Sequence, residues 1–305
     1  MDELKAVWMD GELVPWEQAK VHVSVNALHY GSAVFEGCRG YYHNNEIYLF
    51  RLREHLKRLV DSARIIMLNN PYTVDQLQQA VVRTVRENGY NSNIYVRPVI
   101  YAGENIMSLN ASELPVHAFI IVFQFDKFFT KQGLRVCVSS WRRLPDTSMP
   151  PRAKSSANYL NSILASTEAR KAGYDEAILL DQSGFVSEGA GENIFLVKDG
   201  VINTPSTSSA ILEGITRDAV ITLATDMGYK VVERPITRTE LYTADELFFT
   251  GTAVEILPIL EVDGRTVGDG SAGPVTKQLT EKYFRVVRGQ EPNYRRWLTP
   301  VYGRA

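Results

Sequence analysis

A lysine and a carboxylate in two short motifs are the residues of this chain best suited to chemistry. Lys154 lies in residues 150–159, Pro-Pro-Arg-Ala-Lys-Ser-Ser-Ala-Asn-Tyr, between turn signals and the start of a predicted helix. Glu188 lies in residues 186–195, Val-Ser-Glu-Gly-Ala-Gly-Glu-Asn-Ile-Phe, which predict a glycine-rich turn flanked by strands. Such a lysine can form a Schiff base, and such a carboxylate can keep a pyridine nitrogen protonated. Together they indicate pyridoxal phosphate chemistry, whereas alone each could be a surface lysine or a turn carboxylate.

Two turns of small and hydroxyl residues could bind a phosphate. Residues 213–218, Glu-Gly-Ile-Thr-Arg-Asp, precede an apolar helical run and place Thr216 at the N-cap or in the first turn. Residues 250–253, Thr-Gly-Thr-Ala, follow a predicted strand. Backbone N–H groups at a helix start, with the helix dipole behind them, form an anion site. An ordinary helix cap is the alternative.

Two arginines could bind anions. Arg58 lies in a predicted helix, from which it could reach the same phosphate across the domain boundary through a charge-assisted fork. The alternative is that Arg53, Lys57 and Arg58 form a solvated helix face. Arg97 interrupts the apolar strand 94–101, so it needs either a ligand or an ion pair with a neighbouring carboxylate.

Composition favours a globular protein that acts on a small polar ligand. The 305 residues suffice for two domains, and a net charge of −2 with 45% hydrophobic residues gives no sign of nucleic-acid or membrane-surface binding. The charged residues 1–6 lead into no apolar run, which predicts a cytoplasmic protein without a transmembrane helix. Cys38 and Cys137 lack metal-ligand spacing, so we expect buried thiols and no metal.

The order of predicted elements indicates two α+β domains rather than a doubly wound fold. Residues 1–125 predict a small domain with early strands, one of them continuous from Val34 to Tyr42. Its two helices, near 52–66 and 74–88, follow one another instead of alternating with strands. Residues 126–133 predict a linker, which should border the active site because pockets often form at domain interfaces. Residues 134–305 predict a larger domain of short strands, with helices at 158–172, 216–227 and 274–288.

The ordered motifs of the chain resemble the branched-chain amino acid aminotransferases, which are fold-type IV pyridoxal phosphate enzymes. The resemblance implies a small α/β N-terminal domain and a larger, barrel-like C-terminal domain with helices. The motifs that carry it are Ala27-Leu28-His29-Tyr30-Gly31, Val34-Phe35-Glu36-Gly37, Arg53-Glu54-His55, Tyr95-Val96-Arg97-Pro98, Ala153-Lys154, residues 187–193, Gly214-Ile215-Thr216-Arg217 and residues 251–256.

The resemblance implies a role for each cofactor residue. Lys154 would be the Schiff-base lysine and the proton shuttle, Glu188 would pair with the pyridine nitrogen, and Tyr159 would hydrogen-bond the ring's phenolic oxygen. Leu212 would pack against the ring. The phosphate would be held by Arg58, by the backbone amides of Ile215 and Thr216, and by Thr252.

The resemblance also implies the substrate site. Tyr95 and the amides of Thr252 and Ala253 would lie near the α-carboxylate, and Arg97 would bind the second carboxylate of glutamate. Phe35, Gly37 and the linker aromatics would line a side-chain pocket, and Tyr30 and Leu109 would reach in from a second subunit of a homodimer.

The expected reaction is reversible ping-pong transamination between L-leucine, L-isoleucine or L-valine and 2-oxoglutarate, giving 2-oxo acids and L-glutamate. A D-amino acid or (R)-amine transaminase and an aminodeoxychorismate lyase share the fold and stay open as alternatives. Arg97 and the Gly-Thr-Ala turn favour the branched-chain group. Phe125 and Phe128 replace the Trp and Tyr of some relatives, and Val254 replaces an alanine common in the group.

Overall fold

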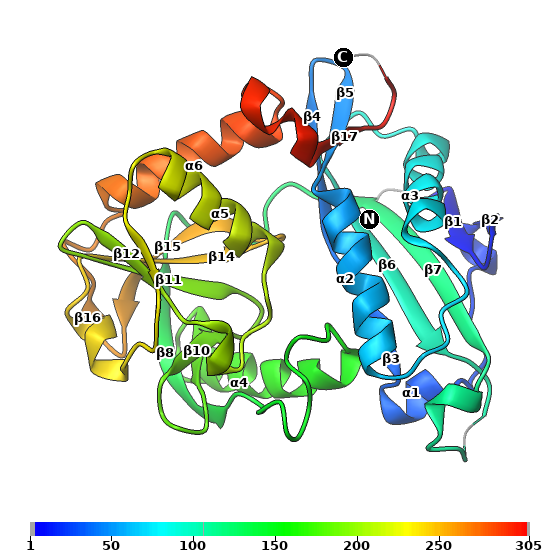
Figure 1. Ribbon diagram of the computed structural model, residues 1–305, viewed down its shortest axis with the longest axis horizontal. Coiled ribbons are helices and arrows are strands. Elements are labelled where there is room, and N and C mark those ends of the chain that lie inside the picture. The colour runs from blue at the N-terminus through cyan, green and yellow to red at the C-terminus, as the bar shows by residue number, and fades with distance from the viewer. Residues whose placement is uncertain (1–3, 106, 304–305) are drawn as a thin grey trace. The chain divides into compact units, whose positions relative to one another are not determined.

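The computed structural model describes residues 4–105 and 107–303, which form two compact units. The first unit comprises Met1–Asp126, Ala153–Ala157 and Arg285–Ala305, and the second comprises Lys127–Arg152 and Asn158–Phe284. The segment carrying Lys154 and the end of the chain thus group with the first unit, although the sequence placed both in one stretch, 134–305. Figure 1 labels the elements of each unit.

An antiparallel sheet of eight strands forms the first unit, in the order β17-β5-β4-β6-β7-β1-β2, with β3 paired to β6. Its helices pack buried leucine, valine and alanine side chains against this sheet. A capping box between Thr73 and Gln76 starts the second long helix. The elements are β1 (Ala6–Met9), β2 (Glu12–Pro15), α1 (Asn26–Tyr30), β3 (Ala33–Phe35), β4 (Cys38–His43), β5 (Glu46–Phe50), α2 (Leu52–Ile65), α3 (Val74–Asn88), β6 (Ile94–Ala102), β7 (Val116–Gln124) and β17 (Leu298–Pro300).

A break at Glu36 and Gly37 divides what the sequence predicts as one strand. The Glu36 N–H donates to the carbonyl of Pro98 at 2.9 Å, and the Gly37 N–H donates to the Glu36 carboxylate at 3.1 Å. A Cβ on Gly37 would lie 1.8 Å from the Tyr95 hydroxyl oxygen, so only glycine fits here. The prediction of a continuous strand from Val34 to Tyr42 was therefore wrong.

A mixed sheet of nine strands forms the second unit, in the order β10-β9-β8-β15-β14-β11-β12-β13, with β16 paired to β15. The Val186 N–H at one end donates to the Ile236 carbonyl beyond the other end at 2.8 Å, which curls the sheet towards a barrel. The elements are β8 (Leu134–Arg142), α4 (Tyr159–Lys171), β9 (Glu176–Leu180), β10 (Val186–Gly189), β11 (Asn193–Lys198), β12 (Val201–Thr204), α5 (Ile215–Asp226), β13 (Val231–Glu233), β14 (Glu246–Gly251), β15 (Glu255–Val262), β16 (Arg265–Thr266) and α6 (Pro274–Val287).

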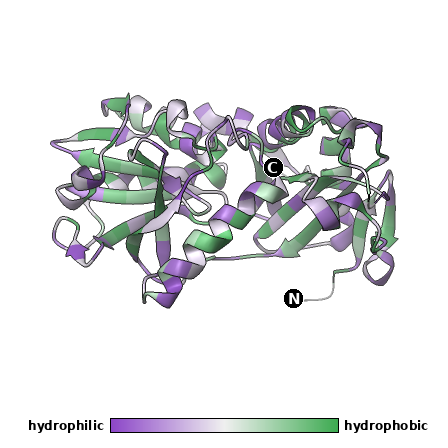
Figure 2. Cartoon of the chain, turned by 90° about the horizontal axis from the view of Figure 1, so that it is seen from below, coloured by the Kyte–Doolittle hydropathy of each residue, from purple (hydrophilic) through white to green (hydrophobic). Residues whose placement is uncertain are grey.

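The α+β fold class is confirmed, and the five long helices agree with the sequence to within a residue or two at each end. In Figure 2 the strands are mostly green and the connecting segments mostly purple or white, as expected when strand side chains form the cores. Strand β15 was not predicted, because Pro258 and two glutamates interrupt its apolar pattern.

Candidate active site

Lys154 is held in the first unit through its backbone. Its N–H donates to the Ser62 hydroxyl on α2 at 3.0 Å, and its carbonyl accepts from the Phe35 N–H at the end of β3 at 3.0 Å. The Nζ atom lies 5.0 Å from the centroid of the Phe35 ring. The half-buried lysine therefore projects from a backbone fixed on two sides, with its amine beside the aromatic ring that the sequence assigns to the substrate pocket.

Arg58 belongs to a buried network rather than to a solvated helix face. The Glu36 carboxylate, which is fully buried, accepts from Arg58 Nε at 2.5 Å and Nη2 at 3.0 Å, and from His55 Nδ1 at 2.8 Å. Burial alone would raise the pKa of Glu36, but Arg58 and His55 together hold it well below its usual range. Burial lowers the pKa of His55. The network thus carries an ionised carboxylate and a fixed guanidinium.

Arg97 has no carboxylate partner among the described residues, so the ion-pair alternative was wrong. Its Nη2 atom donates to the Tyr95 hydroxyl at 3.3 Å, and its guanidinium carbon lies 4.7 Å from the Phe35 ring centroid. The Arg97 Nε atom is buried without a hydrogen-bond acceptor. The structure thus brings Phe35, Gly37 and Tyr95 together around the Arg97 guanidinium, which has no carboxylate partner among the described residues.

Replacing Gly37 with alanine is expected to destabilise the protein by about 1–3 kcal/mol, because the new methyl group overlaps the Tyr95 hydroxyl and forces the ring to move. Urea unfolding followed by circular dichroism measures the loss. Gly191→Ala is the matched control, since a Cβ there meets nothing within 4 Å. Equal stability of the two variants would contradict the close approach at Gly37.

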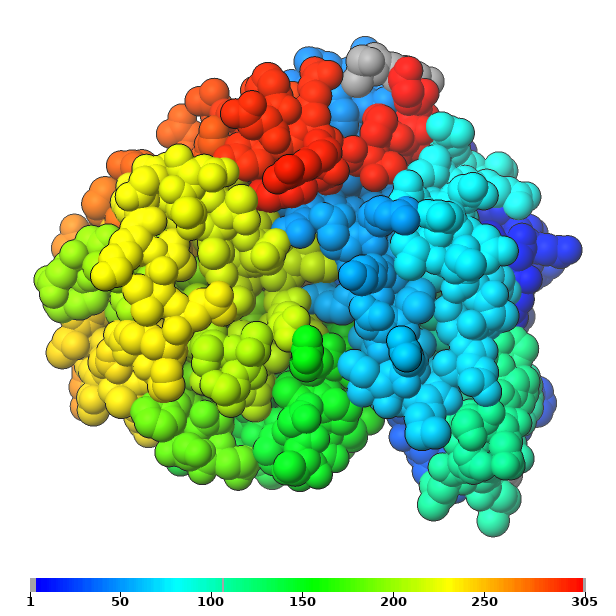
Figure 3. Space-filling model, in the orientation of Figure 1, coloured from blue at the N-terminus to red at the C-terminus, as the bar shows by residue number. Residues whose placement is uncertain are grey.

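Tyr30 and Leu109 lie at the surface of the first unit, 47% and 84% exposed. The buried Asn26 side chain joins their two segments, since its Nδ2 atom donates to the carbonyls of Asn105 at 2.8 Å and Ser108 at 2.7 Å. Figure 3 shows the teal segment that carries Leu109 projecting at the lower edge of this unit. Further exposed apolar residues of the same two segments are Val23, Leu28 and Met107.

In the second unit, Glu188 lies in strand β10 and not in a turn, which corrects the sequence prediction. Its buried carboxylate accepts from Arg143 Nε at 2.7 Å, from Asn193 Nδ2 at 3.1 Å and from the Leu212 N–H at 3.0 Å. The sequence reasoning missed Arg143 and did not assign Asn193. Asn193 follows Glu188 within one motif and could have been found, whereas Arg143 lies far away in the sequence and is brought in only by folding.

Helix α5 presents its N-terminus next to this carboxylate network. Gly214 is the N-cap residue and makes no side-chain capping hydrogen bond, and Ile215 and Thr216 are the first two residues of the helix. A Cβ on Gly214 would lie 1.9 Å from Asn193 Oδ1, which ties the helix start to the Glu188 network. Thr216 is buried, whereas Leu212 is half-buried. The backbone N–H groups of a helix start such as this one can bind an anion.

The other residues of the second unit that the resemblance assigns to the site lie at two other places. Tyr159 is the first residue of α4. Thr252 and Ala253 form the turn between β14 and β15, and both are half-buried.

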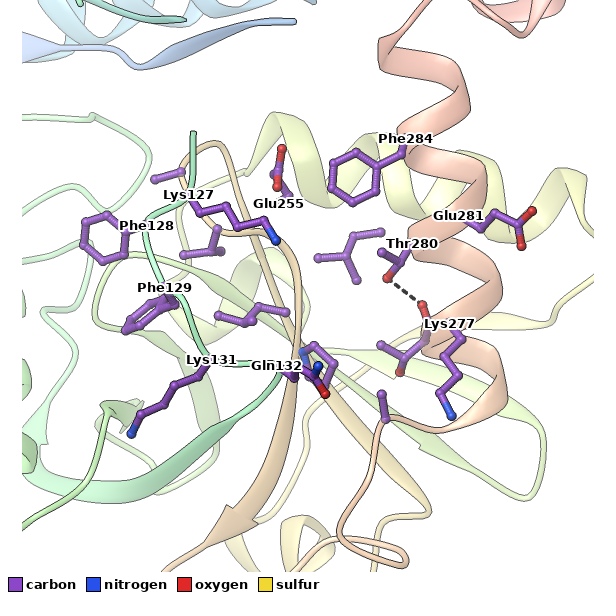
Figure 4. Close-up of a pocket in the computed structure, with 17 residues that line it drawn as sticks. Lys127, Phe128, Phe129, Lys131, Gln132, Glu255, Lys277, Thr280, Glu281 and Phe284 are labelled. Carbon is purple, nitrogen blue, oxygen red and sulfur yellow. Dashed lines mark hydrogen bonds between the residues drawn. The ribbon is translucent and has the colours of Figure 1, made fainter. Parts of the chain in front are cut away.

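Ala253 also lines a cavity of about 410 Å³ together with Phe128, between the segment 127–132, strand β15 and helix α6. In Figure 4 the Lys127 side chain extends across it towards Glu255 and Phe284, while the Phe128 ring lies on the opposite side. Phe125, which directly precedes the predicted linker, instead packs edge-on against Tyr95 in the first unit, with ring centroids 5.4 Å apart. The two aromatics therefore lie in different surroundings.

Two further features of the described residues concern metal binding and membrane insertion. The described residues contain no group of three or more histidine, cysteine, aspartate or glutamate side chains that could hold a metal ion. Within residues 4–105 and 107–303, no helix combines the length and apolarity needed to cross a membrane.

Comparison with known proteins places these residues in a family. The chain matches the class IV aminotransferase family over residues 33–262 and belongs to it. It is 46% identical over 299 residues to the branched-chain-amino-acid aminotransferase of Pseudomonas aeruginosa, covering 97% of each chain. Its structure is similar to the branched-chain aminotransferase of Thermoproteus uzoniensis solved with norvaline, with a TM-score of 0.95, 50% identity and coverage of 97% and 99%.

A second solved relative was determined in its cofactor-bound form. It is the branched-chain amino acid aminotransferase of Thermobaculum terrenum in the PLP form, which is the holo form of that protein. The TM-score is 0.93 at 41% identity, with coverage of 99% of this chain and 99% of that one.

Proposed function

We propose that this protein is a branched-chain amino acid aminotransferase, which uses pyridoxal 5′-phosphate to transfer the amino group of L-leucine, L-isoleucine or L-valine to 2-oxoglutarate. Relatives 44–50% identical over nearly the whole chain carry this name. The single observation that carries the choice of acceptor is Arg97, a guanidinium surrounded by aromatic rings with a buried Nε atom and no carboxylate partner among the described residues. A dicarboxylate substrate supplies that partner.

The residues present fit pyridoxal phosphate. Glu188 keeps a buried, ionised carboxylate for a pyridine nitrogen because Arg143, Asn193 and the Leu212 N–H all donate to it. The N-terminus of α5 and the guanidinium of Arg58 suit a phosphate dianion. When bound, the cofactor supplies an aldehyde that condenses with amines and a ring that withdraws electrons from the substrate α-carbon.

Each of the following residues would then have its own role in holding the cofactor or moving the proton. Lys154 would bond the cofactor through its Nζ atom and would move the proton at the substrate α-carbon. Glu188 would accept the hydrogen bond of the ring nitrogen, Tyr159 would donate to the phenolic oxygen, and Leu212 would contact the ring. Arg58, Thr252 and the amides of Ile215 and Thr216 would hold the phosphate.

Different residues would contact the aliphatic side chain and the carboxylates of the substrates. Tyr95 and the amides of Thr252 and Ala253 bind the α-carboxylate, while Phe35 and Gly37 leave an apolar wall for an aliphatic side chain. Arg97 binds the second carboxylate of 2-oxoglutarate and glutamate. Apolar burial thereby selects the donor, and one cation selects the acceptor.

Replacing Arg97 with alanine is expected to weaken the 2-oxoglutarate half-reaction by about 10²-fold more than the leucine half-reaction, because only the dicarboxylate loses a charged partner. Single-turnover kinetics, followed by the absorbance of the bound cofactor, measure each half-reaction separately. The exposed Arg296 supplies a control variant, Arg296→Ala, expected to leave both half-reactions unchanged. Equal losses in the two half-reactions would remove Arg97 from this role.

The same assay tests the donor. Turnover of the cofactor by L-leucine and not by D-amino acids or (R)-amines supports the branched-chain assignment. Rapid reaction with D-alanine or an (R)-amine alone would instead identify a D-amino acid or (R)-amine transaminase, and release of pyruvate from aminodeoxychorismate would identify a lyase.

We also propose a homodimer in the cytoplasm, in which Tyr30 and Leu109 reach the active site of the partner subunit. The support is the exposed apolar group of Val23, Leu28, Tyr30, Met107 and Leu109, which the Asn26 side chain fixes as one surface. Burying such residues against a second copy removes apolar area from water.

A further inference from the structure

Glu36 lies at the break between β3 and β4, where it is fully buried. Both its backbone and its side chain are held, because its own N–H donates to the Pro98 carbonyl and the Gly37 N–H donates to its carboxylate. The carboxylate position is therefore set by the sheet rather than by a flexible loop. It has no direct role in the reaction proposed above.

The contact between Glu36 and Arg58 fixes the direction of the guanidinium. Arg58 donates through Nε to one carboxylate oxygen at 2.5 Å and through Nη2 to the other at 3.0 Å. Such a two-point contact along one edge sets the plane of the guanidinium and therefore the direction of its opposite edge. The Arg58 side chain is only 14% exposed, which limits solvent screening of the pair.

Helix α2 connects this pair to the lysine. His55, Arg58 and Ser62 follow one another at spacings of three and four residues, which places them on one face of the helix. His55 donates to Glu36, and Ser62 accepts from the backbone N–H of Lys154. One helix face thus holds the arginine and the segment of the lysine in a single arrangement.

Fold stability alone does not account for this cluster. A buried ion pair commonly stabilises a fold no better than apolar side chains of the same size, because both charges lose their hydration. Its advantage is a unique orientation of the charged groups. The sheet, the carboxylate and the helix therefore orient Arg58 before any ligand binds.

We propose that Glu36 is a positioning residue for the cofactor phosphate and acts through Arg58. The proposal rests on the function proposed above, in which Arg58 holds the phosphate. Removing the Glu36 charge would let the Arg58 guanidinium rotate away, so that the phosphate loses an oriented partner. The affinity of the protein for ligands without a phosphate would not change.

The test compares pyridoxal 5′-phosphate with pyridoxal, which lacks the phosphate, as ligands of the full-length chain. Spectrophotometric titration gives the dissociation constant of each ligand for the wild type and for Glu36→Gln, Arg58→Met and the double variant. Glu36→Gln is expected to weaken pyridoxal 5′-phosphate binding by about tenfold or more, because a charge-assisted contact is lost, and to change pyridoxal binding less than about twofold. The double variant should bind no more weakly than Arg58→Met, since Glu36 acts through that arginine.

Glu46→Gln is the matched control for a merely structural effect. Glu46 is a second fully buried glutamate of the same sheet, and it accepts from the backbone N–H groups of Ile47, Val301 and Tyr302. We expect this variant to lose stability without a change in the ratio of the two dissociation constants. An equal loss of affinity for both ligands in Glu36→Gln overturns the positioning role.

Two further outcomes separate this inference from the proposed function. If Arg58→Met leaves pyridoxal 5′-phosphate binding unchanged, the phosphate assignment itself fails. If Arg58→Met weakens binding but Glu36→Gln does not, the positioning role alone fails. Should Glu36→Gln not fold, Glu36→Asp keeps the charge but shortens the side chain by one methylene, and a loss selective for the phosphate ligand is again required.

Discussion

Alanine in place of Lys154 is expected to abolish transamination, with turnover falling by at least about 10⁴-fold. The variant lacks the amine proposed both to bond the cofactor and to move the α-proton. Steady-state rates with L-leucine and 2-oxoglutarate measure the loss. The cofactor absorbance should also change, because the covalent bond to the protein is gone.

The control for this experiment is Lys171→Ala, since Lys171 is exposed at the end of helix α4. It should keep normal turnover, and Lys154→Ala should keep the wild-type oligomeric state in sedimentation analysis. Normal activity in Lys154→Ala would end the assignment of this lysine and of the proposed mechanism with it.

Glu188→Gln is expected to lower the rate of both half-reactions by about 10²–10³-fold. The amide has nearly the same shape but no charge, so it cannot hold a protonated pyridine nitrogen, and it leaves Arg143 as a buried cation without its anion. Single-turnover rates with L-leucine and with 2-oxoglutarate measure the effect. The ratio of the two rates should stay near that of the wild type, because the cofactor ring serves both directions.

Loss of the fold must be separated from loss of chemistry in this variant. Thermal unfolding of the holoenzyme shows whether Glu188→Gln is folded at the assay temperature, and Glu281→Gln on the exposed face of α6 is the neutral control. If folded Glu188→Gln has rates within about threefold of wild type, the loss of rate is too small for the proposed electrostatic role.

The fold could be predicted from sequence wherever the signals were local. Apolar residues at helical spacing define α2 and α3, Thr73 caps α3, and runs of β-branched and aromatic residues define β6 and β7. What could not be predicted depends on long-range pairing. The break at Gly37 exists because Tyr95 occupies the space, and the strand character of Glu188 depends on β9 beside it.

The residues of the candidate site also divide into those with a local sequence signal and those recognised only in the folded structure. Lys154, Glu188 and the turn before α5 stand in motifs with their own chemical character, so the sequence alone indicated their roles. Glu36 and Arg143 do not. Glu36 lies between two strands and Arg143 follows β8, and only folding shows that they are the partners of Arg58 and Glu188. Arg97 was recognised as unusual, but its surroundings of aromatic rings were not predicted.

The pairing of β17 with β5 has a consequence for handling the protein. The Val301 N–H donates to the Ile47 carbonyl, and the Val301 carbonyl accepts from Arg86 Nε, so the last strand closes an otherwise open edge of the first sheet. Pro300 lacks an N–H group, which discourages a further strand from joining there. Shortening the chain before Leu298 would uncover β5 as a template for intermolecular aggregation.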